Sequence, residues 1–586
     1  MPSCREVATS EEYADFIVTY AGSEPQQIFE QFETECYQRI SSFFGTVYRK
    51  LDDIEELSLK NYAYNSIPAL YGLMENDISL RRNDKEAALE QAGIYRLQNQ
   101  PALQLRGQGC IVGFVDTGIN IEDMDFRFSN GDTRILRIWD MTDNEGVPPL
   151  GISYGSEYDE TSINELLRNE LSQNGLSQNG LSQDGLLQNE LLQNELPQDG
   201  ISQNGLDGNN LSGLNISYPG HDNNNHGNIL AKIAAGNDGA APDCRIVAVK
   251  LKEAKRYLRD YHKIREDALA YQENDIMLAV NYIKDVGLQL KMPVVLCIAL
   301  GTNSRSHDGR SALSYVLDSF SSIQSSACCV AGGEEGNKQL HARGNTDMGM
   351  ELNTVELRVD ERQEGLVVHI WGMNPQVLSV GLVSPTGEVI PRIPARLGRS
   401  DTYRLLFEET IVTIEYDLAE SASGDELILI RFDKPTSGIW KIQIDGGRFD
   451  AYLPISQFLY EGTYFLVPEP DTTIIDPAYA RRVITSVDYN PSSGALYIGQ
   501  GRGFSRNGYI KPDLASPVSV SVLTGASALL LGWGVQYGDL DVIESADIKT
   551  YLIRGANREN TMTYPNKEWG YGKLDAYNAF EVLRGN

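Results

Sequence analysis

Apolar runs and helical segments alternate through the chain after residue 98. Cys110–Val115, Ile246–Leu251 and Val294–Leu300 are apolar runs of strand length, and a polar helix is expected through Asp275–Val286. Alternation of strand, helix and strand is typical of a parallel sheet covered by helices. The sequence therefore predicts an α/β domain whose first part spans residues 98–349.

A different pattern fills residues 350–467, where short strand-length runs follow one another between turns. The runs are Val355–Val359, Leu366–Trp371, Leu378–Val383, Tyr403–Phe407, Ile411–Tyr416, Glu426–Phe432 and Ile439–Ile444. Regular short strands without intervening helices favour an antiparallel β-sandwich. Residues 468–586 return to mixed segments, among them the uncharged, small-residue stretch Leu514–Gly534, which indicates a buried element. We interpret 350–467 as an insertion that divides the α/β domain.

Residues 1–97 predict a small separate α/β unit. An extended segment, Phe16–Tyr20, precedes an amphipathic helix expected near Gln26–Phe44, and a closing helix is expected around Asp84–Ala92. Gln98–Pro101 is the predicted junction with the following domain.

A five-residue repeat runs through residues 161–216, with Leu or Ile at every fifth position from 166 to 216. A period of five fits neither a helix nor a flat strand, but it would suit a small coil that buries one Leu per side. The low complexity and the many Asn, Gln and Gly residues favour a disordered or expanded surface loop over that coil. Nothing in the repeat suggests chemistry.

The chain is strongly acidic. Its 586 residues carry 81 acidic and 50 basic side chains, a net charge of −31, which argues against nucleic acid or an anionic membrane surface as partner. No run of about 18 apolar residues is present, and the first residues do not form a signal peptide, so we expect no membrane span and synthesis in the cytoplasm.

Seven cysteines are odd in number, sparse, and mostly set in apolar runs. No C-x-x-C spacing occurs, and no histidine makes metal-ligand spacing with a partner on one helix face. We therefore expect free, buried thiols in a reducing compartment, no disulfide framework, no metal and no cofactor.

Two short motifs suggest chemistry. Asp116 ends an apolar strand, which is where open parallel sheets place their sites, and His226 opens a segment of helical spacing that ends at Gly236. An aspartate in that place can fix the tautomer of a histidine and stabilise its imidazolium form. The simpler alternatives are a turn-capping Asp116 and a structural His226.

These motifs, Gly113–Gly118 and Asn225–Asn228, together with Lys511-Pro512-Asp513, resemble the subtilisin-like serine proteases, whose triad follows the chain order Asp, His, Ser. The resemblance implies that Asp116 and His226 hold triad positions. It also implies that residues 1–97 are a propeptide and that the inserted sandwich is a jelly roll.

Three departures from the family pattern bear on activity. The family's Gly-Thr-Ser segment, which carries the nucleophile, is not found: Ala515-Ser516-Pro517 runs almost directly into the later part of the helix that the nucleophile opens. Ser527 is a weak alternative, and a buried helical serine is the simpler interpretation of it. Glu334 stands where the oxyanion-hole Asn belongs, and an ionised carboxylate cannot donate a hydrogen bond. Asn228 replaces the family's Thr.

Further segments resemble the Csp germination proteases of spore-forming clostridia and their relatives. They are Gly155–Tyr158, Ile163–Leu166, Gly301–Asn303 and Ser306–Gly309. The resemblance implies a catalytically inactive Csp pseudoprotease that is made in the mother cell, associates with the spore and regulates germination through protein binding. Implied partners are other Csp proteases or a cortex hydrolase pro-enzyme, its own retained propeptide, and a small-molecule germinant. The alternatives are an active endopeptidase that processes the cortex-lytic pro-enzyme and a scaffold unrelated to germination.

Overall fold

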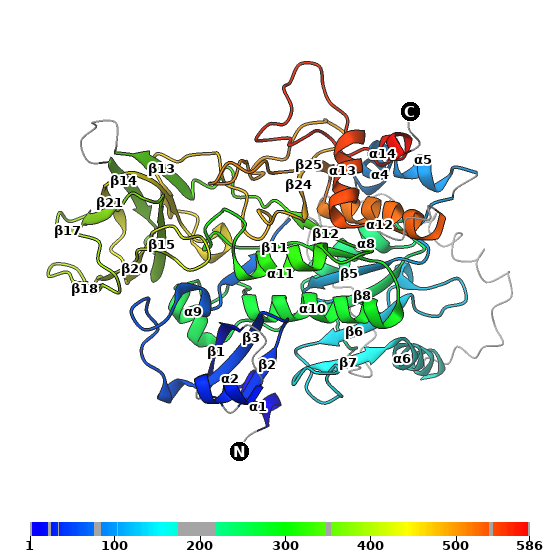
Figure 1. Ribbon diagram of the computed structural model, residues 1–586, viewed down its shortest axis with the longest axis horizontal. Coiled ribbons are helices and arrows are strands. Elements are labelled where there is room, and N and C mark those ends of the chain that lie inside the picture. The colour runs from blue at the N-terminus through cyan, green and yellow to red at the C-terminus, as the bar shows by residue number, and fades with distance from the viewer. Residues whose placement is uncertain are drawn as a thin grey trace, which may run out of the picture.

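The computed structural model describes residues 3–20, 25–32, 34, 36–75, 84–101, 104–173, 218–346, 353–537 and 543–583. Three units lie side by side in Figure 1: an amino-terminal unit (residues 3–75), a central α/β domain, and an inserted sandwich (residues 341–465). The amino-terminal unit contacts both of the others.

The α/β domain is built on one eight-stranded sheet in the order β25-β24-β12-β10-β5-β8-β6-β7. All its strand pairs are parallel except the edge pair β6–β7. Its strands are β5 (Ile111–Asp116), β6 (Ile135–Asp140), β7 (Ser156–Asp159), β8 (Arg245–Lys250), β10 (Val294–Ile298), β12 (Ser326–Ala331), β24 (Ile484–Tyr489) and β25 (Leu514–Pro517). Its helices are α4 (Lys85–Gln91), α5 (Ile94–Gln98), α6 (Glu160–Gln173), α8 (His226–Ala235), α9 (Arg256–His262), α10 (Glu273–Leu290), α11 (Ala312–Ser321), α12 (Val520–Tyr537), α13 (Ser545–Gly555) and α14 (Ala576–Leu583).

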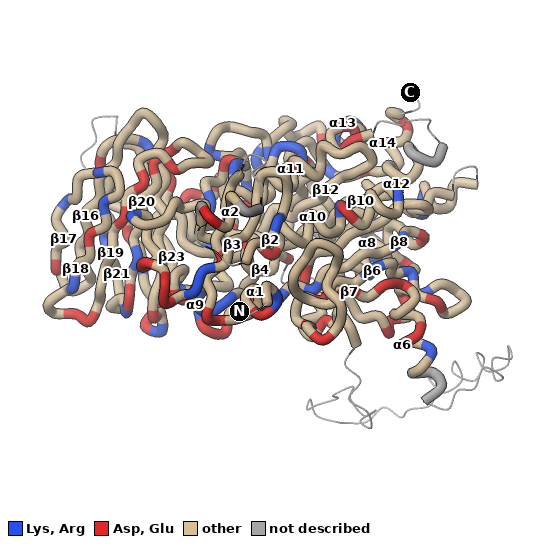
Figure 2. The backbone as a smooth tube through the Cα atoms, turned by 60° about the horizontal axis from the view of Figure 1, so that its bottom comes forward, with Lys and Arg blue, Asp and Glu red and all other residues tan. Residues whose placement is uncertain are grey.

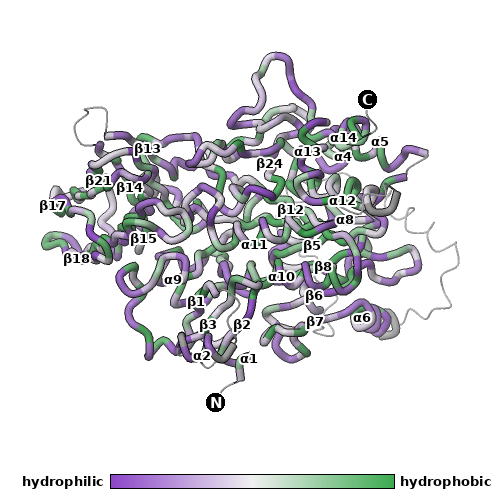
Figure 3. Tube along the Cα trace, viewed as in Figure 1, coloured by the Kyte–Doolittle hydropathy of each residue, from purple (hydrophilic) through white to green (hydrophobic). Residues whose placement is uncertain are grey.

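The predicted strands and helices of this domain are confirmed. β5, β8 and β10 coincide with the three apolar runs, and α10 with the predicted helix between the last two. Leu514–Gly534 is buried, as β25 followed by most of α12, and α12 packs against α8, β10 and β12. Figure 3 shows hydrophobic positions, in green, gathered in these central elements.

Part of the five-residue repeat is helical. Residues 161–173 belong to α6, where Ile163 and Leu167 are buried against the α/β domain. The rest of the repeat, from residue 174, lies outside the described residues. Within the described part of the chain, no helix combines the length and the apolar character needed to cross a membrane.

The amino-terminal unit is a three-stranded antiparallel sheet, β1 (Tyr13–Thr19), β3 (Phe44–Lys50) and β2 (Cys36–Arg39), with two short helices, α1 (Cys4–Thr9) and α2 (Pro25–Phe32). The extended segment was predicted correctly. The single helix expected over Gln26–Phe44 is wrong, because helix α2 ends at Phe32 and Cys36–Phe44 forms β2 and the turn into β3. Apolar residues at 36, 37, 40, 43 and 44 happen to fall at helical spacing in this hairpin.

The cysteine prediction needs one correction. Cys4 and Cys36 form a disulfide, which joins α1 to β2. The other five cysteines are free and buried, as expected. The pair gave no sequence signal, because 32 residues separate the two thiols and only the packing of α1 on the sheet brings them together.

The inserted unit is an antiparallel sandwich of two sheets, ordered β13-β22-β15-β20-β19-β18 and β17-β16-β21-β14-β23. Its strands are β13 (His341–Asn345), β14 (Asn353–Val359), β15 (Gly365–Gly372), β16 (Ser379–Val383), β17 (Val389–Ile393), β18 (Ser400–Arg404), β19 (Ile411–Asp417), β20 (Leu427–Asp433), β21 (Gly438–Asp445), β22 (Arg448–Tyr452) and β23 (Tyr464–Phe465). The sequence missed β13, β17, β22 and β23 and set β18 about three residues late. The predicted architecture is confirmed.

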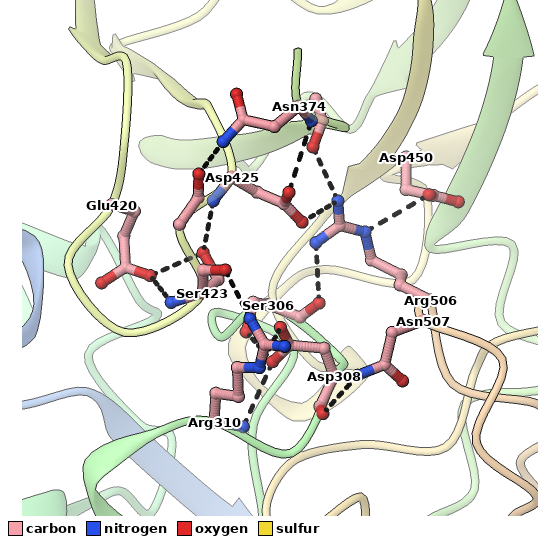
Figure 4. Close-up of polar contacts among 12 residues, drawn as sticks. Ser306, Asp308, Arg310, Asn374, Glu420, Ser423, Asp425, Asp450, Arg506 and Asn507 are labelled. Carbon is pink, nitrogen blue, oxygen red and sulfur yellow. Dashed lines mark hydrogen bonds and ion pairs between the residues drawn. The ribbon is translucent and has the colours of Figure 1, made fainter. Parts of the chain in front are cut away.

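A buried arginine joins the sandwich to the α/β domain. Figure 4 shows the guanidinium of Arg506 among Asp425, Asp450 and the carbonyl of Ser306. The Arg506 side chain is 2% exposed, and its Nη2 also donates to the carbonyl of Gly372 at 2.8 Å. Because burial of a charge is costly unless it is paired, this cluster fixes the position of the sandwich relative to the α/β domain.

Candidate active site

Asp116 and His226, predicted as partners, meet at the carboxyl end of β5. His226 Nδ1 lies 2.7 Å from Asp116 Oδ1, and the two side chains are 4% and 3% exposed. Asp116 also accepts from the backbone N–H of Thr117 at 2.7 Å, while the Thr117 hydroxyl accepts from Gly227 N–H at 3.0 Å. These contacts hold the first turn of α8 against the end of β5 and orient the imidazole.

The other ring nitrogen of His226 is also occupied. Nε2 lies 2.5 Å from the carbonyl oxygen of Met74, at the end of the amino-terminal unit. Both nitrogens therefore face oxygen acceptors, and only the imidazolium can donate to both. Burial alone would lower the pKa of His226, but the charge of Asp116, its hydrogen bond and the Met74 carbonyl raise that pKa to about 9.

Met74 reaches His226 because a strand of the amino-terminal unit occupies the cleft. β4 (Leu70–Leu73) is the middle strand of a three-stranded antiparallel sheet, between β11 (Leu300–Gly301) and β9 (Tyr271–Gln272). Met74 N–H continues the pairing by donating to the Ala299 carbonyl at 2.8 Å. β4 is buried along its whole length, and a Cβ added to Gly301 would overlap the Met74 side chain. β4 thus fills the space between β9 and β11 as an added antiparallel strand.

Glu75, the next residue, closes the amino end of α12. Its carboxylate accepts from the Ser519 hydroxyl at 2.5 Å and from Val520 N–H at 2.8 Å, and the residue is 1% exposed. A carboxylate at this end satisfies backbone donors of the helix and interacts favourably with its dipole. The amino end of α12 is therefore covered by the chain's own acidic side chain.

The connection into α12 is short and strained. β25 ends at Pro517 and α12 begins at Val520, so Val518 and Ser519 alone span the gap. Val518 has φ 69° and Glu75, facing it, has φ 60°. The left-handed region is disfavoured for residues with a Cβ, most of all for β-branched ones such as Val518. No segment corresponding to the family's Gly-Thr-Ser lies between β25 and α12.

Ser527 lies within α12. It is fully buried, and its hydroxyl donates to the Leu523 carbonyl one turn earlier at 2.9 Å and lies 3.4 Å from the sulfur of Cys329. Glu334 is half-buried on the loop after β12, and the neighbouring Glu335 accepts from the hydroxyl and the N–H of Ser456 at 3.0 and 3.1 Å.

Sequence reasoning missed Met74, Glu75 and the contact of Glu75 with Ser519. The signal for the first two was the apolar run Ala69–Met74, which is of strand length and ends at an acidic residue. The predicted junction, Gln98–Pro101, lies at the end of α5, where the Gln98 amide donates to the carbonyls of Gly239 and Ala240 at 3.0 Å each. Among the described residues, no group of three or more His, Cys, Asp or Glu side chains is placed to hold a metal ion.

Comparison with known proteins agrees with this geometry. The subtilase family, Peptidase_S8, matches residues 107–529, most of the chain. The structure of the Clostridium perfringens CspB protease is similar, with a TM-score of 0.68 and 24% sequence identity over 85% of this chain and 97% of that one. The psychrophilic subtilisin-like protease Apa1 from Pseudoalteromonas sp. AS-11 matches at 10% identity over 84% and 98% of the two chains, with a TM-score of only 0.29. No curated protein matches the sequence. The family match, the sheet order and the Asp116–His226 pair lead to one conclusion: this chain belongs to the subtilase family and has the subtilisin-like fold.

Proposed function

We propose that this chain is a pseudoprotease of the Csp group, which keeps the subtilisin-like fold but does not cleave peptides. The observation that carries the proposal is the closure of His226 between Asp116 and the Met74 carbonyl. In the serine protease mechanism, Nε2 of the histidine takes the proton of the nucleophile. With a pKa of about 9, His226 is an imidazolium at neutral pH and cannot accept that proton.

The lack of a nucleophile supports the same proposal. Ser519 and Ser521 flank Val520, the first residue of α12, and the Ser519 hydroxyl donates to Glu75 rather than to a histidine. In subtilisin, loss of either the serine or the histidine lowers kcat by about 2 × 10⁶. Either defect would leave little activity, and Glu334 in place of an amide donor would lower it further.

The biological role follows from the resemblance to the Csp group. We propose that the protein regulates spore germination by binding other Csp proteases or a cortex hydrolase pro-enzyme, in response to a small-molecule germinant. Its amino-terminal unit stays covalently attached, since the Ser519 hydroxyl donates to Glu75 and both ring nitrogens of His226 are occupied. The protein would be made in the mother cell and carried in the spore.

The test combines intact mass with labelling by a fluorophosphonate, which reacts only with an activated serine. We expect a single species with the mass of the full 586-residue chain and no label, beside a labelled sample of the CspB protease. Ser519→Ala and Ser527→Ala variants are matched controls.

A chain cut near the predicted junction, Gln98–Pro101, or after Met74 would show that this is an active endopeptidase. Labelling that disappears in one of the two serine variants would show the same. If no label is found but spores of a deletion strain germinate normally, the chain is an inactive scaffold outside germination.

A further inference from the structure

A half-open cavity of about 680 Å³ lies where the three units meet. Its walls come from β1 and β3 of the amino-terminal unit, from α11 and the loop before it, and from the sandwich loop that contains Ser421 and Ala422. Small-molecule sites in proteins have volumes of roughly 300–1,000 Å³ and often lie between domains. The cavity is large enough for a ligand and lies apart from the cleft that β4 fills.

Two arginines give the cavity a positive wall in an acidic protein. The chain carries a net charge of −31, and its acidic residues, red in Figure 2, are spread over all three units. Arg310 is 45% exposed, and its Nη1 donates to the Ser423 carbonyl at 2.7 Å, as Figure 4 shows. Arg481 is exposed, with its guanidinium 4.6 Å from the ring centre of Tyr509. Both side chains are thus steadied by neighbours while their charges remain near solvent.

The acidic residue of the lining, Asp318, is engaged elsewhere. Its carboxylate accepts from the backbone N–H groups of Arg481 and Arg482, at 3.2 and 2.6 Å. It therefore fixes the backbone beneath Arg481 through hydrogen bonds of its own. Asp308 Oδ2 lies 3.8 Å from Nε of Arg310, and Nη1 of Arg310 donates to Ser423, so this arginine contributes charge and one further donor group. The exposed guanidinium of Arg481 can bind a carboxylate through two parallel hydrogen bonds.

The opposite wall is apolar. The rings of Phe44 and Tyr315 meet edge to face with their centres 5.5 Å apart, and Tyr315 is 44% exposed. The apolar part of a ligand in contact with these two rings would be removed from water, which favours binding by roughly 25 cal/mol for each Å² of apolar surface buried.

We propose that the cavity binds a small organic anion, with its carboxylate at Arg310 and Arg481 and its apolar body against Phe44 and Tyr315. Because three units form the walls, such a ligand stabilises their assembly and not one unit alone. The inference goes beyond the proposed function and does not depend on it. The cavity needs the amino-terminal unit in its place on the other two units, and it would be the same whether or not the chain had been cleaved.

Calorimetric titration of the full chain tests the site with three pairs of probes: benzoate, 4-phenylbutyrate and octanoate, each against its alcohol. We expect at least one carboxylate to bind, and its alcohol to bind about tenfold more weakly or not at all, because a charge-assisted hydrogen bond is lost. Arg481→Gln should weaken the carboxylate by a similar factor. Arg482→Gln, a change of the neighbouring arginine outside the lining, should have no effect.

A second variant blocks the cavity without changing its charge. Thr19 is exposed at the end of β1 and lines the cavity, and Trp is well suited to a strand, so Thr19→Trp should fold and abolish binding. The proposal would be overturned if the acids and alcohols bound equally, or if none of the six probes bound. It would also be overturned if the Arg481 and Arg482 variants lost affinity equally, or if Thr19→Trp bound as well as the wild type.

Discussion

Two buried Asp–His pairs occur among the described residues, and one of them lies in the cleft. In the cleft, His226 lies between Asp116 and the Met74 carbonyl, at 2.7 and 2.5 Å. In the sandwich, His341 lies between Asp450 and the Asp471 carbonyl, at 2.9 and 2.8 Å. The two histidines are 4% and 1% exposed. The cleft histidine thus has the surroundings of a structural one.

The pairs differ in what else the carboxylate holds. Asp450 also binds Arg343 and Arg506, at 2.6 and 3.3 Å, whereas the other donors to Asp116 are the backbone and hydroxyl of Thr117. Burial alone would raise the pKa of Asp450, but His341 and the two arginines hold it well below its usual range. An Asp–His pair is therefore a weak sign of catalysis by itself. The two pairs differ in the ring nitrogen that faces the carboxylate, Nδ1 in His226 and Nε2 in His341, and in the charges around them.

Removal of the charge of Asp450 should have the largest effect. In Asp450→Asn, Arg506 stays buried with only Asp425 to balance it, and breaking a buried ion pair in this way costs about 3–5 kcal/mol. Thermal and urea unfolding measure the loss. Asp267→Asn is the control, since Asp267 is 68% exposed in its pair with Arg265 and should leave stability unchanged. Equal unfolding of the two variants would contradict the structural role of the sandwich cluster.

Titration of His226 should give the next largest effect. Its pKa is about 9 in the folded protein and 6.5 when unfolded, so its stabilisation is complete below pH 6.5 and is lost as the pH rises through 9. A pKa shift of this size contributes about 3 kcal/mol to the free energy of unfolding below pH 6.5. We expect the melting temperature of the wild type to fall between pH 6.5 and 9.5 more steeply than that of His226→Gln. Parallel curves would mean that His226 is neutral in the fold, which would contradict the charged state used above to explain inactivity.

Much of the fold and half of the site could be predicted from the sequence. Runs such as Val294–Leu300 are apolar throughout, because strands of a covered parallel sheet are buried on both faces, and this signal is local. Asp116 and His226 were recognised because each sits at a defined end of such an element. Ser519 was not recognised as part of the site, since it does not lie in the motif that marks a nucleophile.

The occupant of the cleft could not be predicted. Nothing local distinguishes Leu70–Met74 from a strand within the amino-terminal sheet, and only the pairing of β4 with β9 and β11 decides its place. The contact of Glu75 with Ser519 spans 444 residues of sequence. Tertiary pairing over such distances leaves no periodic pattern, which is also why the disulfide between Cys4 and Cys36 was missed.

The smallest effect tests whether Glu75 and His226 act together. The negative charge of Glu75 is among the causes that raise the pKa of His226, and its carboxylate receives two hydrogen bonds at α12. Glu75→Gln keeps the shape of the side chain but removes the charge, so we expect a loss of about 1–2 kcal/mol and a shift of the alkaline transition to lower pH. Glu86→Gln, on the exposed first turn of α4, is the matched control and should move neither. His341 offers no counterpart to this change, because arginines and not a second carboxylate flank its pair with Asp450. If the alkaline transition of Glu75→Gln is not shifted, Asp116 is the carboxylate that raises the pKa of His226, without a contribution from Glu75.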